Sequence, residues 1–333
     1  MREHGKLRVL HYGLGEIGAG IARESAATGR LQSVGAVDVD PSKVGNPLAS
    51  LYGQSGDVTV RGTLGEALAD AGKDGVDVAF HCAGSHIDAI EGQLLELIEA
   101  GCNVVTTAEE VIWPYGSRDE AASRLDAAAK RKGVTLFAAG VNPGFLLDRL
   151  PTYLSSMTLG PTAVRAERLV DLSRRRTALR RKMGVGEDAA AVRERTKTFA
   201  IGHAGFPESV RYLAAALGWA VGDVVQTLEP VVADRRVERA GEIVEVGQVL
   251  GLAHTARAIA PDGKEISFSL TMRLDCEEPF DQIEIDARPP VIVRFPIGLQ
   301  GDLATLASAV NACGFVVTAP SGLVCRLATP IAI

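Results

Sequence analysis

The feature that most constrains the fold is the stretch from Lys6 to Arg23, where an apolar run passes directly into a glycine-rich turn and then into a helical pattern. Gly13, Gly15 and Gly18 spell G-x-G-x-x-G. In such a unit the first glycine permits a tight turn, the second lets the backbone approach a pyrophosphate, and the third lets helix and strand pack closely. The stretch therefore predicts a dinucleotide-binding loop. The alternative is a glycine turn that serves packing alone.

The whole loop is a candidate cofactor site, because the amides of the first helical turn face a bound anion. Its candidate residues are Gly13, Leu14, Gly15, Glu16, Ile17 and Gly18. Asp38 ends the next apolar run, twenty residues after Gly18, where a carboxylate accepts a hydrogen bond from a ribose 2′-hydroxyl. This favours NAD. Lys43 lies close to the place of a 2′-phosphate and keeps NADP open, although a solvated side chain is the simpler interpretation of this lysine.

Short apolar strands and helical patterns alternate as far as residue 139, with brief connections. The alternation predicts an α/β fold with a Rossmann-type, doubly wound parallel sheet. Ligands bind beyond the carboxyl ends of the strands in such a fold, so the loops after residues 12, 38, 82, 107 and 139 should line one crevice. Ala83 and Gly84 are therefore candidate cofactor contacts. Ser85 and Asp88 are expected to cap the helix that follows them.

The pattern changes beyond residue 141. Strands dominate between 160 and 300, and ISFSLTMRL (266–274) alternates strictly between apolar and polar side chains, which predicts a half-buried strand. We expect a Rossmann domain over 1–141, a substrate-binding and dimerisation domain with a mixed or antiparallel sheet (α+β) over 142–301, and a C-terminal helix and tail over 302–333 that return to the first domain. That helix is expected over about 302–312, with Asp302 as its N-cap.

Composition excludes several classes of partner. The net charge of −6 gives no reason to expect nucleic acid, and no apolar segment reaches membrane-spanning length. Five scattered cysteines without a C-x-x-C indicate reduced thiols rather than a disulfide framework or a zinc site. We therefore expect a cytoplasmic protein that binds no metal.

Two adjacent carboxylates are the strongest candidates for catalysis. TTAEEV (106–111) follows a predicted strand and so lies in the expected crevice, where buried charge is costly unless it is paired or used. In an extended segment only one of the two side chains would face a ligand. Glu109 is the preferred candidate and Glu110 the substitute. The alternative is an acidic pair at a helix N-terminus.

Other candidates follow the last strand of the alternating region. Asn142 in VNPGFLLDRLP (141–151) is expected beside the nicotinamide. Phe145 and Leu146 are expected to line the substrate pocket. Leu147 and Trp219 would extend its apolar wall. Residues of this kind also form simple hinge turns. His203 and His254 are further candidates for the substrate pocket. A purely structural role is the alternative for each histidine. The basic cluster at 174–182 is interpreted as a solvated face or an intersubunit salt-bridge patch, and a phosphate-binding site is the alternative.

Several stretches together resemble a known family. They are GLGEIGAGIAR, VGAVDVDPSKVG, TTAEE, GVNPGFLLDRLP, VDLSRRRTALRRKMGVG, GHAGFPESVRYLAAALGW and QGDLATLASAVNACGFVVTAPSGL. The chain resembles the dihydrodipicolinate-reductase-like superfamily, and within it the branch of 2,4-diaminopentanoate dehydrogenases and related NAD(P)-dependent amine dehydrogenases. It lacks the paired-histidine and lysine motif and the glycine-threonine segment of true dihydrodipicolinate reductases.

The resemblance implies a Rossmann domain, a homodimer and a glutamate of TTAEE that holds ammonia or the substrate amine. It implies reversible oxidative deamination of an amine to a ketone or aldehyde plus ammonium, by hydride transfer to or from an imine, with NAD or NADP. Amino-acid or diamine dehydrogenation of the 2,4-diaminopentanoate type is the alternative within enzymes. A non-catalytic NAD(P)H sensor is the alternative outside them, and the acidic pair in the crevice argues against it.

Overall fold

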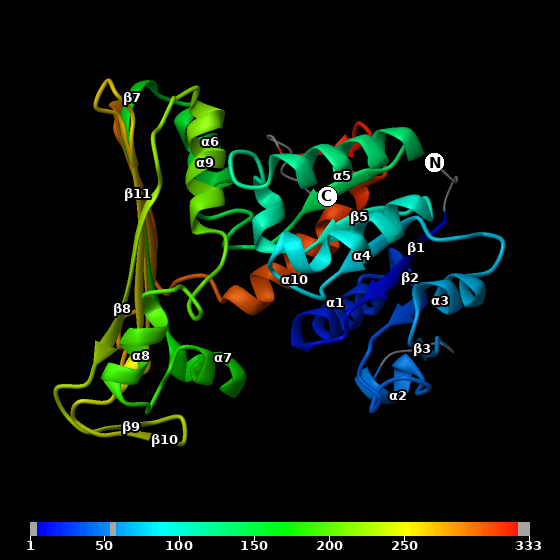
Figure 1. Ribbon diagram of the computed structural model, residues 1–333, viewed down its shortest axis with the longest axis horizontal. Coiled ribbons are helices and arrows are strands. Elements are labelled where there is room, and N and C mark those ends of the chain that lie inside the picture. The colour runs from blue at the N-terminus through cyan, green and yellow to red at the C-terminus, as the bar shows by residue number, and fades with distance from the viewer. Residues whose placement is uncertain (1–4, 54–57, 326–333) are drawn as a thin grey trace. The chain divides into compact units, whose positions relative to one another are not determined.

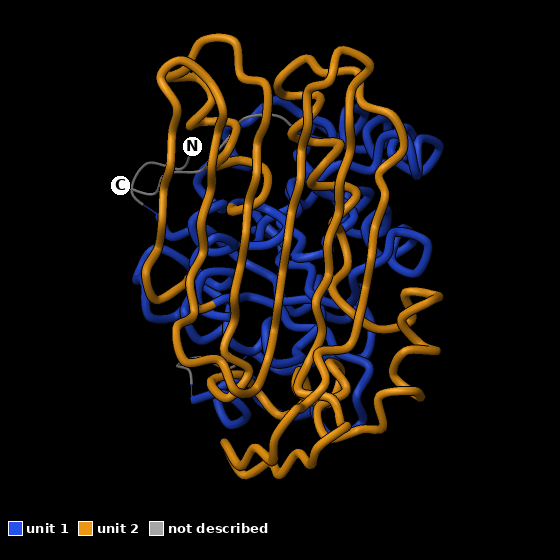
Figure 2. Tube along the Cα trace, turned by 90° about the vertical axis from the view of Figure 1, so that its left-hand side faces the viewer, with its two compact units in different colours: residues 1–145, 301–333 blue, residues 146–300 orange. Residues whose placement is uncertain are grey.

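The computed structural model describes residues 5–53 and 58–325 of the chain. The chain divides into two compact units, which are coloured separately in Figure 2. Unit 1 comprises residues 1–145 and 301–333, and unit 2 comprises residues 146–300. Residues 326–333 of the expected C-terminal tail lie outside the described residues.

Unit 1 is built, in the described part of the chain, on a seven-stranded sheet of order β15-β6-β5-β4-β1-β2-β3, in which all neighbours run parallel. The strands are β1 (Leu7–Tyr12), β2 (Leu31–Val37), β3 (Val60–Arg61), β4 (Val78–His81), β5 (Asn103–Thr106), β6 (Thr135–Ala138) and β15 (Gly322–Leu323). The predicted Rossmann-type sheet is confirmed. From β1 the chain first adds β2 and β3 on one side, and then adds β4, β5 and β6 on the other side. The strand order therefore reverses between β1 and β4. Ligands bind beyond the carboxyl ends of the strands at such a point, so the crevice is expected there.

Helices cover both faces of this sheet. They are α1 (Glu16–Ala27), α2 (Leu48–Tyr52), α3 (Leu64–Ala71), α4 (Ile87–Glu99), α5 (Asp119–Lys132) and α10 (Gly301–Val316), with the 3₁₀ turn η1 (Glu109–Ile112). In unit 1, α1 packs against α10 and α4 packs against α5 (Figure 1). Apolar side chains of α1 and α10 share one core with β1, β4, β5 and β6. The C-terminal helix α10 is thus part of the core of unit 1.

The C-terminal helix is longer than expected. It begins at Gly301 and continues to Val316, so Asp302 lies in its first turn instead of at the N-cap. A Cβ atom added at Gly20 of α1 would lie 2.8 Å from the Leu306 side chain. Glycine at that position therefore lets the two helices approach closely, and the apolar surface of α10 becomes part of the core.

Unit 2 contains a six-stranded mixed sheet of order β14-β13-β7-β12-β11-β8 and a small β9–β10 hairpin, counted over the described residues. Its strands are β7 (Leu159–Asp171), β8 (Val225–Val232), β9 (Val237–Arg239), β10 (Glu242–Val244), β11 (Val249–Ile259), β12 (Glu265–Arg273), β13 (Phe280–Arg288) and β14 (Val291–Phe295). Its helices are α6 (Arg149–Ser155), α7 (Thr177–Lys182), α8 (Ala189–Thr196) and α9 (Phe206–Leu217), with the 3₁₀ turn η2 (Leu172–Arg174). The predicted mixed sheet is confirmed, because β7 and β12 run parallel and the other pairs antiparallel.

The alternation that predicted β12 has the expected consequence. Ile266, Phe268, Leu270 and Met272 are buried, and the intervening side chains are half-buried. Helix α9 packs over β11 and β12 on the buried side. In the described part of unit 2, no helix covers the broad face of the sheet that is turned to the viewer in Figure 2. The sheet thus has one closed and one open face.

Candidate active site

The glycine loop between β1 and α1 has the conformation that its sequence predicts. Gly13 has a φ of +85°, and a Cβ atom there would lie 2.9 Å from the carbonyl carbon of Cys82. A Cβ atom at Gly18 would lie 1.9 Å from the carbonyl oxygen of Gly13. Both glycines are therefore required by backbone conformation or close approach.

Gly15 is glycine for a different reason. A Cβ atom at Gly15 would meet no described atom within 4 Å, so internal packing does not require glycine here. Gly15 is also the N-cap of α1 and offers no side-chain hydrogen bond to the amides of the first turn. Open space beside the positive end of a helix fits a pyrophosphate, which needs backbone donors and room for its oxygens.

The other loop candidates can contribute mainly through their backbone. The Leu14 side chain is buried in the core, the Ile17 side chain packs against the core, and Glu16 is exposed. Ala83 and Gly84 follow β4, the strand next to β1, with Ala83 exposed and Gly84 half-buried. The loops after β1 and β4 thus meet at one edge of the sheet.

Asp38 directly follows β2 and anchors the glycine loop. Its Oδ2 atom accepts hydrogen bonds from the Leu14 amide at 2.7 Å and from Lys43 Nζ at 3.0 Å, and its Oδ1 accepts from the Asp40 amide at 2.8 Å. Burial acts to raise the pKa of Asp38, but these donors outweigh it and hold the pKa below its ordinary value. The interpretation of Lys43 as a solvated side chain is wrong, because its ammonium is paired with Asp38.

The two adjacent glutamates begin a turn of 3₁₀ helix. The segment η1 follows β5 directly and carries Glu109 and Glu110 in its first turn. The expectation of an extended segment is therefore wrong, and the alternative of an acidic pair at a helix N-terminus describes the backbone correctly. Both side chains are half-buried.

Glu110 caps a different helix. Its Oε2 atom accepts a hydrogen bond from the Ile87 amide at 2.8 Å, and its Oε1 lies 2.8 Å from His86 Nδ1. Ile87 is the first residue of α4, whose N-cap His86 makes no side-chain cap of its own. The predicted Ser85–Asp88 cap is thus wrong, since a carboxylate from the neighbouring strand's loop takes that place.

We expect Glu110→Ala to lower the free energy of unfolding by about 1 to 2 kcal/mol, because the α4 amide loses its cap. Urea unfolding followed by circular dichroism measures this loss. Glu120→Ala is the matched control, since the Glu120 side chain is 94% exposed in the first turn of α5. Equal stability of the two variants would contradict the capping role.

Asn142 lies in the loop after β6, the strand next to β5, and the acidic pair follows β5. The residue is 6% exposed, and neither Oδ1 nor Nδ2 has a hydrogen-bond partner among the described residues. A buried amide without partners costs free energy. Asn142 therefore fits a site where a ligand supplies a complementary donor and acceptor. Phe145, three residues later, is half-buried.

The candidates in unit 2 have a more structural character. Leu146 has 0% exposure, so its expected place in a pocket wall is corrected to the core, as are those of Leu147 and Trp219. His254 is 4% exposed, stacks on Phe206 with ring centroids 4.3 Å apart, and places Nε2 3.1 Å from Gln226 Oε1.

His203 lies near the same ring. It is half-buried, and its ring centroid is 6.1 Å from that of Phe206. The structure thus brings the two predicted histidines around one phenylalanine. Burial lowers the pKa of both His203 and His254 to about 4.

Buried histidines also predict a dependence of stability on pH. Burial lowers the pKa of His11, His81 and His254 from 6.5 to about 4. Between these values the unfolded chain binds protons that the native chain does not, so acidification from pH 7 to 5 destabilises the fold by roughly 2 kcal/mol per histidine. Unfolding free energies measured across this range in wild type and His254→Gln check this. The variant should show a shallower slope, and an unchanged slope would contradict the assignment.

Two residues of the basic cluster form ion pairs within unit 2. Arg174 Nε lies 3.4 Å from Asp171, and Arg180 Nε donates to Glu242 at 3.0 Å. These pairs give the two arginines a local structural role and provide no support for a phosphate-binding site.

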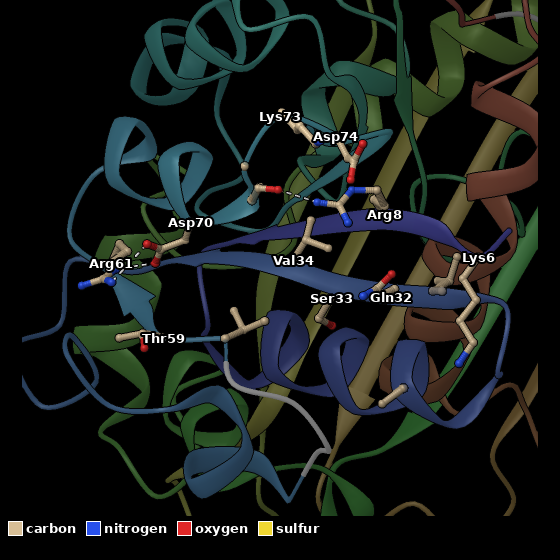
Figure 3. A pocket seen from close by; sticks show the side chains of 15 residues that line it. Lys6, Arg8, Gln32, Ser33, Val34, Thr59, Arg61, Asp70, Lys73 and Asp74 are labelled. Carbon is tan, nitrogen blue, oxygen red and sulfur yellow. Dashed lines mark hydrogen bonds and ion pairs between the residues drawn. The ribbon is translucent and has the colours of Figure 1, made fainter. Parts of the chain in front are cut away.

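A polar pocket of about 780 Å³ opens at the amino ends of β1, β2 and β3, the edge opposite the glycine loop (Figure 3). Arg61 Nε donates to Asp70 at 2.6 Å, and Arg8 Nε donates to the Gly75 carbonyl at 2.8 Å. Both guanidinium groups are therefore engaged by the fold, and the pocket is separate from the candidate site.

No group of three or more His, Cys, Asp or Glu side chains among the described residues is arranged to hold a metal ion. No described helix is both long and apolar enough to cross a membrane.

Comparison with known proteins supports the resemblance. The 2,4-diaminopentanoate dehydrogenase of Acetoanaerobium sticklandii is 25% identical over 338 aligned residues, which cover 98% of this chain and 94% of that protein. The structure of an amine dehydrogenase from Mycobacterium smegmatis is similar with a TM-score of 0.84 and 24% identity, covering 98% of this chain and 96% of that one.

A more distant structure shares the general fold. GenD2 from gentamicin A biosynthesis, solved in complex with NAD, has a TM-score of 0.53 and 21% identity, covering 89% of this chain and 73% of that one. The model of the 2,4-diaminopentanoate dehydrogenase C-terminal domain matches residues 145–333, more than half of the sequence. Together with the glycine loop and the acidic pair, this match shows that the chain belongs to the 2,4-diaminopentanoate dehydrogenase family, dehydrogenases that act on CH–NH₂ groups.

Proposed function

We propose that this protein is an NAD(P)-dependent amine dehydrogenase that interconverts a small amine and water with a ketone or aldehyde and ammonium. The observation that carries the proposal is the place of Glu109, which follows β5 at the edge of the sheet that carries the glycine loop. Glu110 contributes to the same edge through its cap of α4, and we assign contact with the amine to Glu109.

Other residues of unit 1 would bind the cofactor. The glycine loop and the first turn of α1 would hold the pyrophosphate, and Asn142 would pair with a polar group at the nicotinamide end. A bound nicotinamide would supply the acceptor or donor of the hydride that leaves or reaches the amine carbon. Glu109 would accept a hydrogen bond from the ammonium and take up its proton before oxidation. Phe145 and His203 stay candidates for contact with the substrate.

The proposal is tested by NAD(P)H consumption with ammonium and a panel of small aliphatic ketones and aldehydes. We expect consumption that requires both ammonium and the carbonyl compound. Consumption that is independent of ammonium would indicate a carbonyl reductase instead. Binding of NAD(P)H without turnover of any compound would favour the cofactor sensor.

A second candidate function is the oxidation of an amino acid or diamine. Two similarities favour it. Residues 145–333 match the model of the 2,4-diaminopentanoate dehydrogenase C-terminal domain, and the whole chain is similar to a 2,4-diaminopentanoate dehydrogenase. Such substrates carry a second charged group, so the same panel should include 2,4-diaminopentanoate and simple amino acids. Preference for these compounds over apolar amines would select this candidate.

We further propose a cytoplasmic homodimer that forms through the open face of the unit 2 sheet. Val225, Ile259 and Ile292 of this face are 64%, 46% and 69% exposed. They come from three different strands, β8, β11 and β14, and a second copy of the sheet would bury them. Sedimentation equilibrium should give a dimer in wild type and a monomer for Ile259→Asp combined with Ile292→Asp. A monomeric wild type would contradict the proposal.

A further inference from the structure

A buried histidine that the proposed mechanism does not use ends β4. His81 is 0% exposed and lies in register between Tyr12 of β1 and Thr106 of β5, at the carboxyl ends of three neighbouring strands. Thr106 is also 0% exposed and is the last residue of β5, three positions before Glu109. His81 therefore lies beside the strand end from which the chain continues into the acidic pair.

Both ring nitrogens of His81 have a partner. Nε2 lies 2.9 Å from Oε1 of Gln93 in α4, and Nδ1 lies 3.0 Å from Thr106 Oγ1. Because a side-chain carbonyl oxygen can only accept, Nε2 carries the proton and Nδ1 accepts from the Thr106 hydroxyl. Burial lowers the pKa of His81 to about 4, which keeps the ring in this neutral form at pH 7.

The hydrogen bonds continue from Thr106 to the candidate catalytic turn. The Thr106 hydroxyl donates to His81 and keeps its lone pairs for a donor, and its Oγ1 accepts from the Ala108 amide at 3.1 Å. Ala108 is 1% exposed and is the N-cap of η1, which begins at Glu109. The series that starts at Gln93 thus ends one residue before the carboxylate that we assign to the amine.

Backbone hydrogen bonds hold this turn on either side. The Thr107 amide donates to the His81 carbonyl at 3.0 Å, and the Glu110 amide donates to the Ser85 carbonyl at 3.3 Å. Between them, the Ala108 amide is held by the Thr106 side chain. Loss of that hydroxyl would therefore loosen the turn locally, while the backbone pairing of β4 with β5 remains.

We propose that His81 is a positioning residue for catalysis, which orients the Thr106 hydroxyl and thereby holds the backbone from which the Glu109 carboxylate reaches the amine. The inference rests on the proposed function, because it assumes that Glu109 contacts the amine. It assigns no proton transfer to His81, whose two ring nitrogens are committed to Gln93 and Thr106.

Thr106→Val tests the hydrogen bond nearest to the turn. This nearly isosteric change leaves the Ala108 amide without its acceptor, so kcat for amine oxidation should fall about 10- to 100-fold, the effect of misplacing a catalytic group by about 1 Å. The dissociation constant of NADH should change less than about threefold, because the glycine loop takes no part in these hydrogen bonds. Thr106→Ser keeps the hydroxyl and should retain kcat within about threefold of wild type.

Thr135→Val is the matched control. Thr135 lies on β6, is 1% exposed, and its hydroxyl donates to the Pro320 carbonyl at 3.0 Å. Both valine variants lose a hydrogen bond of a buried hydroxyl, so their thermal midpoints should fall by similar amounts. Only Thr106→Val should lose kcat. Equal kcat values in these two variants would overturn the inference.

Two substitutions of His81 separate its two hydrogen bonds. The side-chain amide of asparagine lies near the place of Nδ1 and that of glutamine near the place of Nε2, so only His81→Asn can still accept from Thr106. Both variants lose the ring, whose centroid lies 5.5 Å from that of Tyr12. We expect kcat to be at least about fivefold lower in His81→Gln than in His81→Asn. Equal values, or the reverse order, would overturn the inference.

The tautomer of His81 provides a readout that needs no turnover. Nitrogen-15 NMR of the histidine rings, with His81→Gln to assign the signal, should show a neutral ring with its proton on Nε2 at pH 7. A proton on Nδ1 would overturn the inference and leave the amine dehydrogenase proposal standing. Absence of ammonium-dependent turnover in wild type would overturn both.

Discussion

Glu109→Gln is expected to lower kcat for amine oxidation about 10²- to 10⁴-fold, the usual effect of removing a general acid–base group. The substitution retains the size and hydrogen-bonding capacity of the side chain but removes its charge and its ability to exchange a proton with ammonium. NADH affinity and the thermal midpoint should stay close to wild type, because no part of the proposed cofactor loop changes. Steady-state kinetics with NAD(P)⁺ and the best amine of the panel give the measurement.

Glu110→Gln is the matched control for this prediction. This variant leaves the charge of Glu109 and the glycine loop unchanged. The side-chain carbonyl of the new glutamine can still accept a hydrogen bond from the Ile87 amide of α4. We expect kcat to fall by less than about tenfold, with a measurable loss of stability. The reverse outcome, a large loss of kcat for Glu110→Gln and none for Glu109→Gln, would contradict our assignment.

Asp281→Ala is expected to destabilise unit 2 by about 3 to 5 kcal/mol, because it leaves a buried arginine without its counter-ion. Arg168 Nε donates to Asp281 Oδ1 at 2.7 Å, and the side chains are 4% and 1% exposed. The Leu299 amide donates to Asp281 Oδ2 at 2.7 Å, and Arg168 Nη2 donates to the Leu299 carbonyl at 3.2 Å. The pair thus fixes the segment that follows β14.

The same two strands supply a surface control for this prediction. Arg165 and Asp286 pair at 2.8 Å across β7 and β13, with side chains 45% and 50% exposed. Asp286→Ala should cost less than about 1 kcal/mol, because water replaces the lost partner. Denaturant unfolding compares the variants. Similar losses for the buried and exposed pairs would contradict the account of Asp281.

Much of the fold follows from local patterns. The glycine loop, the apolar strands and the short connections predict the Rossmann sheet. Strict alternation over 266–274 predicts β12 and its buried face, and Pro261-Asp262-Gly263 marks the hairpin between β11 and β12. Each of these features depends on residues that are close in sequence.

The features that the sequence did not predict depend on how the chain folds back on itself. The cap of α4 comes from Glu110, 23 positions after Ile87, so no local capping motif could indicate it. The pairing of Lys43 with Asp38 depends on how the turn after β2 folds back. The extension of α10 to Val316 is stabilised by packing on α1, which only the tertiary structure provides.

The central claim is that hydride and nitrogen meet on one substrate carbon, and isotope labelling tests it most directly. The enzyme would be supplied with NAD(P)H deuterated at nicotinamide C4, ¹⁵N-ammonium and the best carbonyl compound of the panel, and the product analysed by mass spectrometry. Our account predicts an amine that carries deuterium on the carbon bonded to ¹⁵N, formed by wild type and nearly absent with Glu109→Gln. A deuterated alcohol without ¹⁵N would contradict it.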